Sequence, residues 1–412
     1  MLEDYDIVIV GGGMTGATLT CALAATHYRV ALLEAHPFGI VDQSSYDDRS
    51  VALAFGSRRI LDGLGLWSAI APSATPIKTI HVSERGRFGV TRLDHREERV
   101  EALGYIVRNR EIGRALYAQL ANQHNVEVIA PARLQDIVTG ASHAIITIDR
   151  GGKGAAQHQN LRCRLLVAAD GTDSAVRRRL GIGATVFDYA QTAIVANVTP
   201  SRHHAYTAFE RFTATGPLAL LPLNEGRCSL VWTHSSEGTE AAMRLDDARF
   251  LANLQTQFGH RLGCFIKIGA RSAYPLSLLN ARELIKPRVA VIGNAAHTLH
   301  PVAGQGFNLA LRDVAQLAEL LCAAKLGDPG ERALLRHYVT LRRADLRRTT
   351  RFTDGLARLF INPLEPLARA RACALLTLDL VPPLRHILAR RTMGLSGRIP
   401  RLTSGVRLAD IR

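Results

Sequence analysis

The stretch from Gly293 to Asp313, GNAAHTLHPVAGQGFNLALRD, holds more backbone-breaking residues than a simple turn requires. It follows an apolar strand at 288–292 and runs into an amphipathic helix. Glycine lets a backbone approach a ligand closely, and the first turn of a helix offers unbonded N–H groups to an anion. The segment therefore predicts a loop against which a bound molecule must fit.

A second glycine-rich turn, Gly11-Gly-Gly-Met-Thr-Gly16, lies near the N-terminus between an apolar strand and a predicted helix. In a G-x-G-x-x-G turn the first glycine makes the bend, the second admits a pyrophosphate, and the third lets the helix pack on the strand. These positions are Gly11, Gly13 and Gly16. The spacing predicts dinucleotide binding, and the alternative is a purely structural turn.

The strand that follows this helix, at 29–33, ends at Glu34. An acidic side chain about 20 residues beyond the glycines is placed to accept hydrogen bonds from a ribose hydroxyl. The same carboxylate repels a 2′-phosphate, which argues against NADP in this particular site.

A third strand-and-turn unit, LLVAADGTDSAVR at 165–177, ends its strand at Asp170-Gly171. With these three ordered motifs, the chain resembles the aromatic-ring flavoprotein monooxygenases of the para-hydroxybenzoate hydroxylase class, to about residue 340. In that family the first motif holds the ADP half of FAD, and the Asp-Gly unit is linked to FAD and NADPH. The resemblance assigns the ribityl chain to Gly293 and Asn294.

The segments Asp47–Trp67, Ile77–Gly89 and 300–313 narrow the resemblance to the ubiquinone-biosynthesis hydroxylases, and within them to the 2-polyprenyl-6-methoxyphenol hydroxylase branch. By this resemblance Arg49 contacts the phosphate–ribose region of FAD, and Asn109 is a polar flavin contact. Relatives usually carry Asp where this chain has Asn294, which keeps an acceptor oxygen but loses the charge.

The resemblance implies FAD- and NAD(P)H-dependent hydroxylation of 2-polyprenyl-6-methoxyphenol in ubiquinone biosynthesis. NAD(P)H reduces a non-covalently bound FAD, O₂ adds to form a C4a-hydroperoxyflavin, and the electron-rich phenol attacks the distal oxygen. Two alternatives stay open. One is a related hydroxylase that acts on another ubiquinone intermediate or a soluble phenol, and the other is a non-catalytic flavoprotein scaffold.

The opening loop is then expected to carry the isoalloxazine ring. Gly304 and Gly306 leave the backbone bare and permit unusual φ values, and Pro301 stiffens the approach. Phe307 and Asn308 are expected to start the helix beside the ring.

The histidine His297 in the same loop has two candidate roles, structural hydrogen bonding or phenol deprotonation and proton relay. A metal site is not expected, because no further His or Cys ligands stand at suitable spacing. The six cysteines are scattered, which favours reduced thiols in a cytoplasmic protein.

The order of the elements predicts an α/β protein with a Rossmann-like FAD-binding domain, an inserted and mostly antiparallel substrate sheet, and a helical C-terminal segment. The expected FAD-binding pieces are 1–75, 100–181 and 282–340. The substrate domain is expected at 76–99 and 182–281, and the C-terminal segment at 341–412.

The net charge of +15 is concentrated towards the C-terminus. From residue 331 onwards there are 17 arginines, no lysine and six acidic residues, an excess of 11 positive charges. Interleaved aromatics and nucleic-acid motifs are missing, so a nucleic-acid partner is not expected. We expect a cytoplasmic protein, peripheral on the inner face of the membrane, that meets a lipid-linked phenol, an anionic membrane surface or a ubiquinone-biosynthesis complex.

Overall fold

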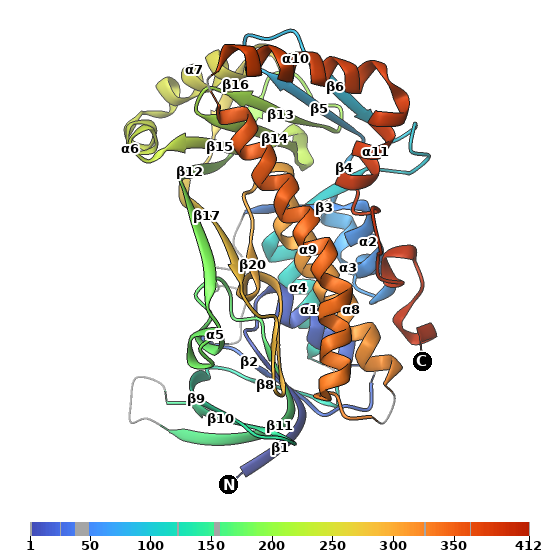
Figure 1. Cartoon of the computed structure of the whole chain (residues 1–412). Coiled ribbons are helices and arrows are strands. Elements are labelled where there is room, and N and C mark those ends of the chain that lie inside the picture. The colour runs from blue at the N-terminus through green and yellow to red at the C-terminus, as the bar shows by residue number, and fades with distance from the viewer. Residues whose placement is uncertain are drawn as a thin grey trace.

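The N-terminal strand forms the centre of a mainly parallel sheet in the computed structural model, which describes residues 2–24, 26–37, 49–121, 123–151, 157–324, 327–362 and 364–411. Five neighbouring strands run parallel in the order β19 (Val289–Val291), β11 (His158–Ala168), β1 (Leu2–Val10), β2 (Val30–Leu33) and β8 (Val126–Ile129). The eight-stranded sheet is completed by antiparallel β18 (Ile285–Lys286), β9 (Arg133–Thr139) and β10 (Ala144–Asp149). Figure 1 shows this sheet at the lower end of the molecule.

The predicted ligand-binding turns leave neighbouring strands at one edge of this sheet. Gly11 directly follows β1, Glu34 follows β2, and Gly293 comes two residues after β19. Asp170 comes two residues after β11. Ligands of open α/β sheets bind outside the carboxyl ends of the strands, so the parallel register gathers motifs that are far apart in the sequence.

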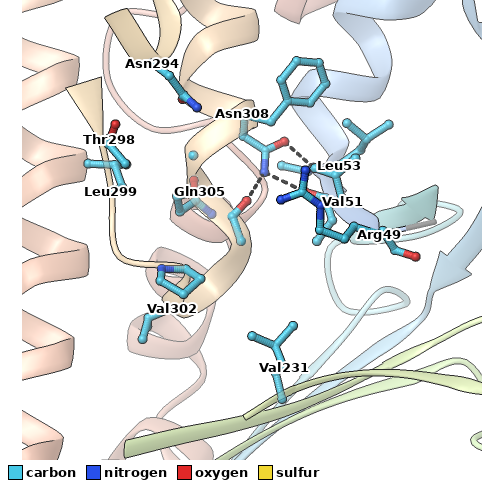
Figure 2. A pocket seen from close by; sticks show the side chains of 18 of the residues that line it. Arg49, Val51, Leu53, Val231, Asn294, Thr298, Leu299, Val302, Gln305 and Asn308 are labelled. Carbon is cyan, nitrogen blue, oxygen red and sulfur yellow. Dashed lines mark hydrogen bonds between the residues drawn. The ribbon is translucent and has the colours of Figure 1, made fainter. Parts of the chain in front are cut away.

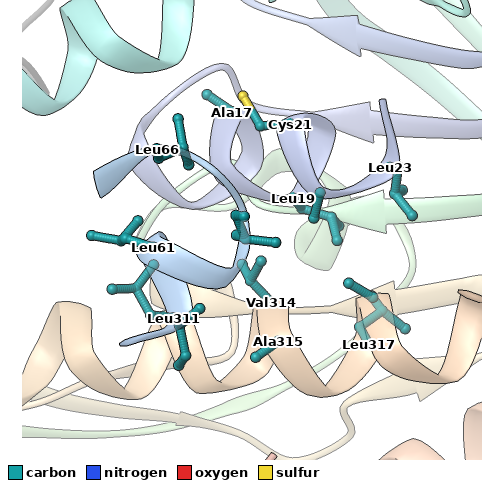
Figure 3. Close-up of a cluster of buried hydrophobic side chains, with 14 of the residues drawn as sticks. Ala17, Leu19, Cys21, Leu23, Leu61, Leu66, Leu311, Val314, Ala315 and Leu317 are labelled. Carbon is teal, nitrogen blue, oxygen red and sulfur yellow. The ribbon is translucent and has the colours of Figure 1, made fainter. Parts of the chain in front are cut away.

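Three helices pack together over one face of the parallel sheet (Figure 3). They are α1 (Met14–Leu23), α2 (Phe55–Gly63) and α8 (Gln305–Ala323), and α4 (Asn109–Leu120) packs against α1. The close approach of α1 depends on Gly16, where a Cβ would lie 2.0 Å from the Gly11 carbonyl oxygen. This is the packing role that the sequence assigned to the third glycine.

The inserted sheet is nine-stranded and, as predicted, mostly antiparallel, since only β13 and β5 run parallel. Its main path is β20 (His297–Thr298), β17 (Ser272–Ala281), β12 (Ala184–Pro200), β15 (Cys228–Ser235), β14 (Gly216–Pro222), β13 (Thr207–Thr213), β5 (Thr79–Glu84) and β6 (Val90–Asp94). Strand β16 (Phe265–Ile268) pairs with β12. The outer face packs on α6 (Ser236–Arg244) and α7 (Asp247–Phe258).

Smaller elements connect the two sheets. A three-stranded sheet is formed by β3 (Ser50–Ala54), β7 (Gly104–Arg108) and β4 (Thr75–Ile77). Short helices follow at α3 (Trp67–Ile70) and α5 (Ala175–Arg179).

The C-terminal segment consists of α9 (Arg332–Ile361), α10 (Glu365–Leu380) and α11 (Pro382–Thr392). Figure 1 shows α9 running from the parallel sheet to the antiparallel one, with α10 across the latter. The boundary expected at 340, between the FAD-binding domain and the C-terminal segment, is therefore misplaced, because α9 runs through it without a break. No Gly or Pro interrupts its helical pattern there.

None of the helices in the described ranges is by itself long and apolar enough to cross a membrane. Helices α10 and α11 reach the required length and composition only as a pair, and they are bent by 97°.

A buried ionic network joins α9 to α8 and to the loop before it. Asp313 on α8 accepts hydrogen bonds from the Arg342 Nε at 2.7 Å, from His297 at 2.6 Å and from the Gly293 N–H at 3.0 Å. Burial alone would raise the pKa of Asp313, but its interactions with His297 and with the Arg342 guanidinium lower it well below its usual value. Arg342 also binds Asp345, which holds Arg312 at 2.8 Å.

We expect Arg342→Met to destabilise the protein strongly, because it leaves the Asp313 carboxylate buried without its main cation. Removing one partner of a buried pair costs about 3–5 kcal/mol. Urea unfolding measures the loss. The matched control is Arg343→Met, whose side chain is exposed, and it should stay within about 0.5 kcal/mol of the parent. Equal stability of the two variants would contradict the role of the network.

Candidate active site

A cavity of about 1070 Å³ begins at the carboxyl ends of β1, β2 and β11. It continues past the loop before α8 and ends between the antiparallel sheet and helices α9, α10 and α11. The cavity therefore has a polar end built on the parallel sheet and a second end built on elements from the rest of the chain.

The glycine-rich turn forms the floor of the polar end. Gly11 and Gly13 line the cavity, whereas Gly16 lies behind them in the helix packing. Gly13 caps α1 without any side-chain hydrogen bond, and the first turn of α1 holds no acidic residue. This helix end can therefore receive the phosphates of a dinucleotide.

Glu34 lines the same end of the cavity, and backbone donors fix its carboxylate. Its Oε2 accepts from the Gly12 N–H at 2.8 Å, and its Oε1 accepts from the His36 N–H at 3.0 Å. The remaining lone pairs can accept from ribose hydroxyls, as the sequence predicted.

The Asp-Gly turn contributes Asp170 and Gly171 to the wall. One Asp170 oxygen accepts from the Val176 N–H at 3.0 Å, and the other is buried without a partner in the described part of the chain. Such an oxygen is available to accept a hydrogen bond from a ligand in the cavity. Behind the turn, the buried Arg177 donates to the carbonyl oxygens of Ala295 and Thr172, so it ties two turns together. This arginine is therefore held inside the protein by two backbone carbonyl groups.

Arg49 and Asn109 both line the cavity where the resemblance expects FAD contacts. The Arg49 guanidinium lies 4.7 Å from the centre of the Tyr274 ring. The Asn109 N–H donates to the Arg49 carbonyl oxygen at 2.8 Å, which sets the two residues side by side. Asp47 and Asp48, which open the same sequence motif, lie outside the described residues.

The loop before α8 presents its backbone to the cavity between the two ends (Figure 2). Gly304 has φ +58, and a Cβ there would lie 2.9 Å from the Ala52 Cβ. Gly306 already belongs to α8, so the unusual φ expected for it is wrong. A Cβ at Gly306 would meet no protein atom within 4 Å, because it would enter the cavity itself. Pro301 and Phe307 line the cavity on either side of these glycines.

Asn308 fastens this loop to the three-stranded sheet. Its Nδ2 donates to the carbonyl oxygens of Ala52 at 2.8 Å and Gly304 at 2.6 Å, and its Oδ1 accepts from the Ala54 N–H at 2.8 Å. Its amide is thus occupied by protein, which makes it a positioning residue. Asn294 differs from Asn308 in its surroundings, because its side chain is exposed and lines the cavity.

His297, for which two roles were left open, belongs to the buried ionic network. It is buried, does not line the cavity, and bonds Asp313 in the network described above. This placement favours structural hydrogen bonding over phenol deprotonation. Nearby His300 is buried with its ring centre 4.9 Å from that of Tyr189, and burial lowers its pKa to about 4.

The far end of the cavity is mainly apolar. The segment PLALLPL at 217–223, which includes most of β14, divides by strand alternation. Pro217, Ala219 and Leu221 line the cavity, whereas Leu218 and Leu220 join the outer core. Across from them, the C-terminal helices supply Phe352, Leu356, Phe360, Leu375, Leu378 and Leu388. The sequence did not identify this second wall.

Comparison with known proteins supplies the decisive observation. A family model described as "FAD binding domain" matches residues 4–353. The chain belongs to this family. It is 38% identical to the ubiquinone hydroxylase UbiL of Rhodospirillum rubrum, over 98% of this chain and 93% of the relative. It is 31% identical to the 3-demethoxyubiquinol 3-hydroxylase of Escherichia coli, over 95% and 99%.

Solved structures share the fold. The p-nitrophenol 4-monooxygenase PnpA of Pseudomonas putida superposes with a TM-score of 0.79 at 20% identity, covering 96% of this chain and 100% of that one. The protein is accordingly an FAD-dependent aromatic-ring monooxygenase that uses NAD(P)H and O₂, and the cavity residues fit FAD. The unpartnered Asp170 oxygen, the bare end of α1 and the open space at Gly306 carry this fit.

We expect Gly304→Val to fold and to keep FAD at the glycine-rich turn, but to couple NAD(P)H oxidation poorly to hydroxylation. Valine disfavours the observed φ and pushes against Ala52, so the loop shifts beside the ring. A displacement of about 1 Å can cost roughly a hundredfold in rate. Paired measurement of NADPH loss and hydrogen peroxide release checks this. The control is Gly355→Ala in α9, where a Cβ meets open space. Parent-like coupling in Gly304→Val would contradict the placement of the ring.

Proposed function

We propose that this protein hydroxylates the aromatic ring of a polyprenylated phenol, 2-polyprenyl-6-methoxyphenol, in ubiquinone biosynthesis. The observation that carries the proposal is the apolar end of the cavity, which continues beyond the loop at Gly304. A soluble phenol would not need this space. A prenyl chain that fills it would gain about 25 cal/mol of binding free energy for each Å² of apolar surface that it buries.

The named relatives support the pathway. One is named a ubiquinone hydroxylase and another a 3-demethoxyubiquinol 3-hydroxylase, so both names refer to hydroxylation of ubiquinone-type compounds. Their names differ in the compound, and the choice of 2-polyprenyl-6-methoxyphenol rests on the sequence resemblance alone.

The protein's own contribution is positioning and exclusion of water. When bound, FAD supplies the redox and oxygen chemistry. The loop held by Asn308 would support the flavin ring, and Val231 of β15 projects towards this loop from the opposite side (Figure 2). The phenol ring is then confined between the loop and the sheet, with its tail directed to the apolar wall.

The test compares three compounds with the FAD-loaded enzyme: 2-geranyl-6-methoxyphenol, 2-methoxyphenol and a prenylated demethoxyubiquinol. We expect the first to give the highest kcat/KM, at least about a hundredfold above the untailed phenol, because each buried CH₂ contributes about 0.8 kcal/mol. A higher kcat/KM for the demethoxyubiquinol would show that the substrate is another ubiquinone intermediate. Equal use of the untailed phenol would overturn the lipid-linked substrate, and no hydroxylation of any of the three would overturn the proposed function.

We also propose that an anionic membrane surface delivers this substrate at the bend between α10 and α11. Five apolar side chains are exposed around this bend: Leu376, Leu380, Val381, Leu384 and Ile387. The inward faces of the same helices supply Leu375, Leu378 and Leu388 to the cavity. A lipid tail that enters beside these helices would meet the apolar wall on their inner faces.

Arginines of the segment divide between two roles. Arg371 binds Glu84 at 2.6 Å and Arg385 binds Glu97 at 2.8 Å, so these two hold the helices on the antiparallel sheet. Arg390 and Arg398 are exposed, and each basic residue near an anionic surface contributes about 1 kcal/mol.

The double variant Leu380→Glu/Ile387→Glu should lose affinity for vesicles of phosphatidylcholine and phosphatidylglycerol by more than about tenfold, since each apolar side chain contributes about 1.5–3 kcal/mol when buried. Co-sedimentation measures it, and parent binding should also weaken with salt. The matched control is Val138→Glu, an exposed apolar residue on β9 in the other sheet. If the parent protein does not bind vesicles and binds only to another protein of the pathway, the membrane proposal is overturned in favour of a protein complex.

A further inference from the structure

One acidic side chain, Glu210 of β13, stands on the cavity face of the antiparallel sheet. Strand alternation directs Ala208, Glu210 and Phe212 to the same face, and all three line the cavity. The other charged residues in the lining are Glu34, His36, Arg49, Arg133, Asp170 and Asp173 around the dinucleotide end, and Arg371 of α10. Among the carboxyl groups of the lining, Glu210 is therefore the one within the mainly apolar substrate end.

The sheet register places Glu210 relative to the flavin loop. Val231 pairs with Ala219, Ala219 with Glu210, and Glu210 with Val82, so these residues form one row across four strands. Val231 points at the loop that carries the ring (Figure 2). Adjacent strands are about 4.8 Å apart, which puts Glu210 roughly 10 Å from Val231 along the row. This separation leaves room for one aromatic ring between them.

Glu210 has no protein partner that would explain its presence. It makes no hydrogen bond or ion pair with any residue that the structure describes, and the row gives it the apolar neighbours Ala219 and Val82. Arg371, the cation that faces the same space, is already bound to Glu84 at 2.6 Å. The side chain keeps some surface open to the cavity, and burial of its carboxyl group among protein atoms raises the pKa of Glu210 to about 7.

An unpaired carboxyl in an apolar cavity costs stability unless a ligand satisfies it. Here the ligand has to bring a hydrogen-bond donor into a mainly apolar pocket, about one ring's width from the flavin loop. A phenol hydroxyl meets this requirement, and a carboxylate is a suitable acceptor for its proton.

We propose that Glu210 is the catalytic residue that binds the phenol hydroxyl of the substrate and accepts its proton as the ring is hydroxylated. The inference rests on the proposed function for the identity of the substrate. In this step the phenol O–H bond breaks, its electron pair stays on the phenol oxygen, and the proton bonds to a Glu210 carboxylate oxygen. The resulting phenolate makes the ring more electron-rich at the carbon that receives oxygen.

Two variants separate binding from proton transfer. Glu210→Gln keeps an acceptor oxygen but cannot take the proton, whereas Glu210→Leu removes both and leaves a side chain that suits the apolar pocket. The ligands are 2-geranyl-6-methoxyphenol and its methyl ether, which has no hydroxyl proton. Binding to the FAD-loaded protein is followed by the change in flavin absorbance.

We expect the parent to bind the phenol roughly ten- to hundredfold more tightly than the ether, because only the phenol can donate a hydrogen bond to the charged carboxylate. Glu210→Leu should bind both about equally. Glu210→Gln should bind the phenol within a few-fold of the parent, yet lose about a hundredfold or more in kcat. The surface variant Glu240→Gln on α6 should match the parent throughout.

The pH profile gives an independent readout. The ionised carboxylate is the active form, so kcat/KM of the parent should rise with pH through about 7, and this limb should be absent in Glu210→Gln. A merely structural Glu210 would leave the profile unchanged.

The two proposals fail in different ways. A parent that prefers the phenol over the ether through Glu210, but hydroxylates no prenylated phenol, overturns the proposed function and supports this site. A parent that hydroxylates the phenol while Glu210→Gln retains its kcat and pH profile overturns the role of Glu210 alone. Equal binding of phenol and ether by the parent overturns it as well.

Discussion

The structure depends on holding a bare stretch of backbone firmly beside a cavity. A loop that must approach a flat ring cannot carry large side chains there, so it loses the packing that normally fixes a loop. Two sets of buried hydrogen bonds replace that packing. Asn308 bonds the loop to the edge of β3, and Asp313 bonds the Gly293 N–H while it holds His297 and Arg342. Because Arg342 belongs to α9, the C-terminal segment is part of the flavin site's support.

This dependence explains why one long helix joins the two sheets. The N-terminal part of α9 anchors on α8 through the ionic network, and its later turns supply Phe352, Leu356 and Phe360 to the apolar wall. The same helix thus fixes the ring loop at one end and shapes the substrate space at the other. Phe360 stacks on Phe212 of the sheet, which closes this wall against β13. Positioning of the cofactor and recognition of a lipid tail are therefore linked through a single rigid element.

Features encoded locally could be predicted from the sequence, and features set by pairing between distant strands could not. The turn at Gly11 and the acid at Glu34 follow from glycine conformations and strand ends over about 20 residues. The row from Val231 to Glu210 depends on the order of strands in a sheet, which no local pattern specifies. In TAFERFT the alternation puts Glu210 on the face of Ala208 and Phe212, and this was the one available signal for it. The basic composition of the tail likewise concealed that Arg342 and Arg371 are buried.

The most direct test of this account is a crystal structure of the FAD-loaded protein with 2-geranyl-6-methoxyphenol. We expect the isoalloxazine over the backbone of Gly304 and Gly306, and the geranyl chain against Phe360 and Leu375. The phenol ring should lie between Val231 and Glu210, with its hydroxyl on the Glu210 carboxylate. A phenol bound elsewhere, or one inverted so that its tail points to the dinucleotide end, would contradict this expectation.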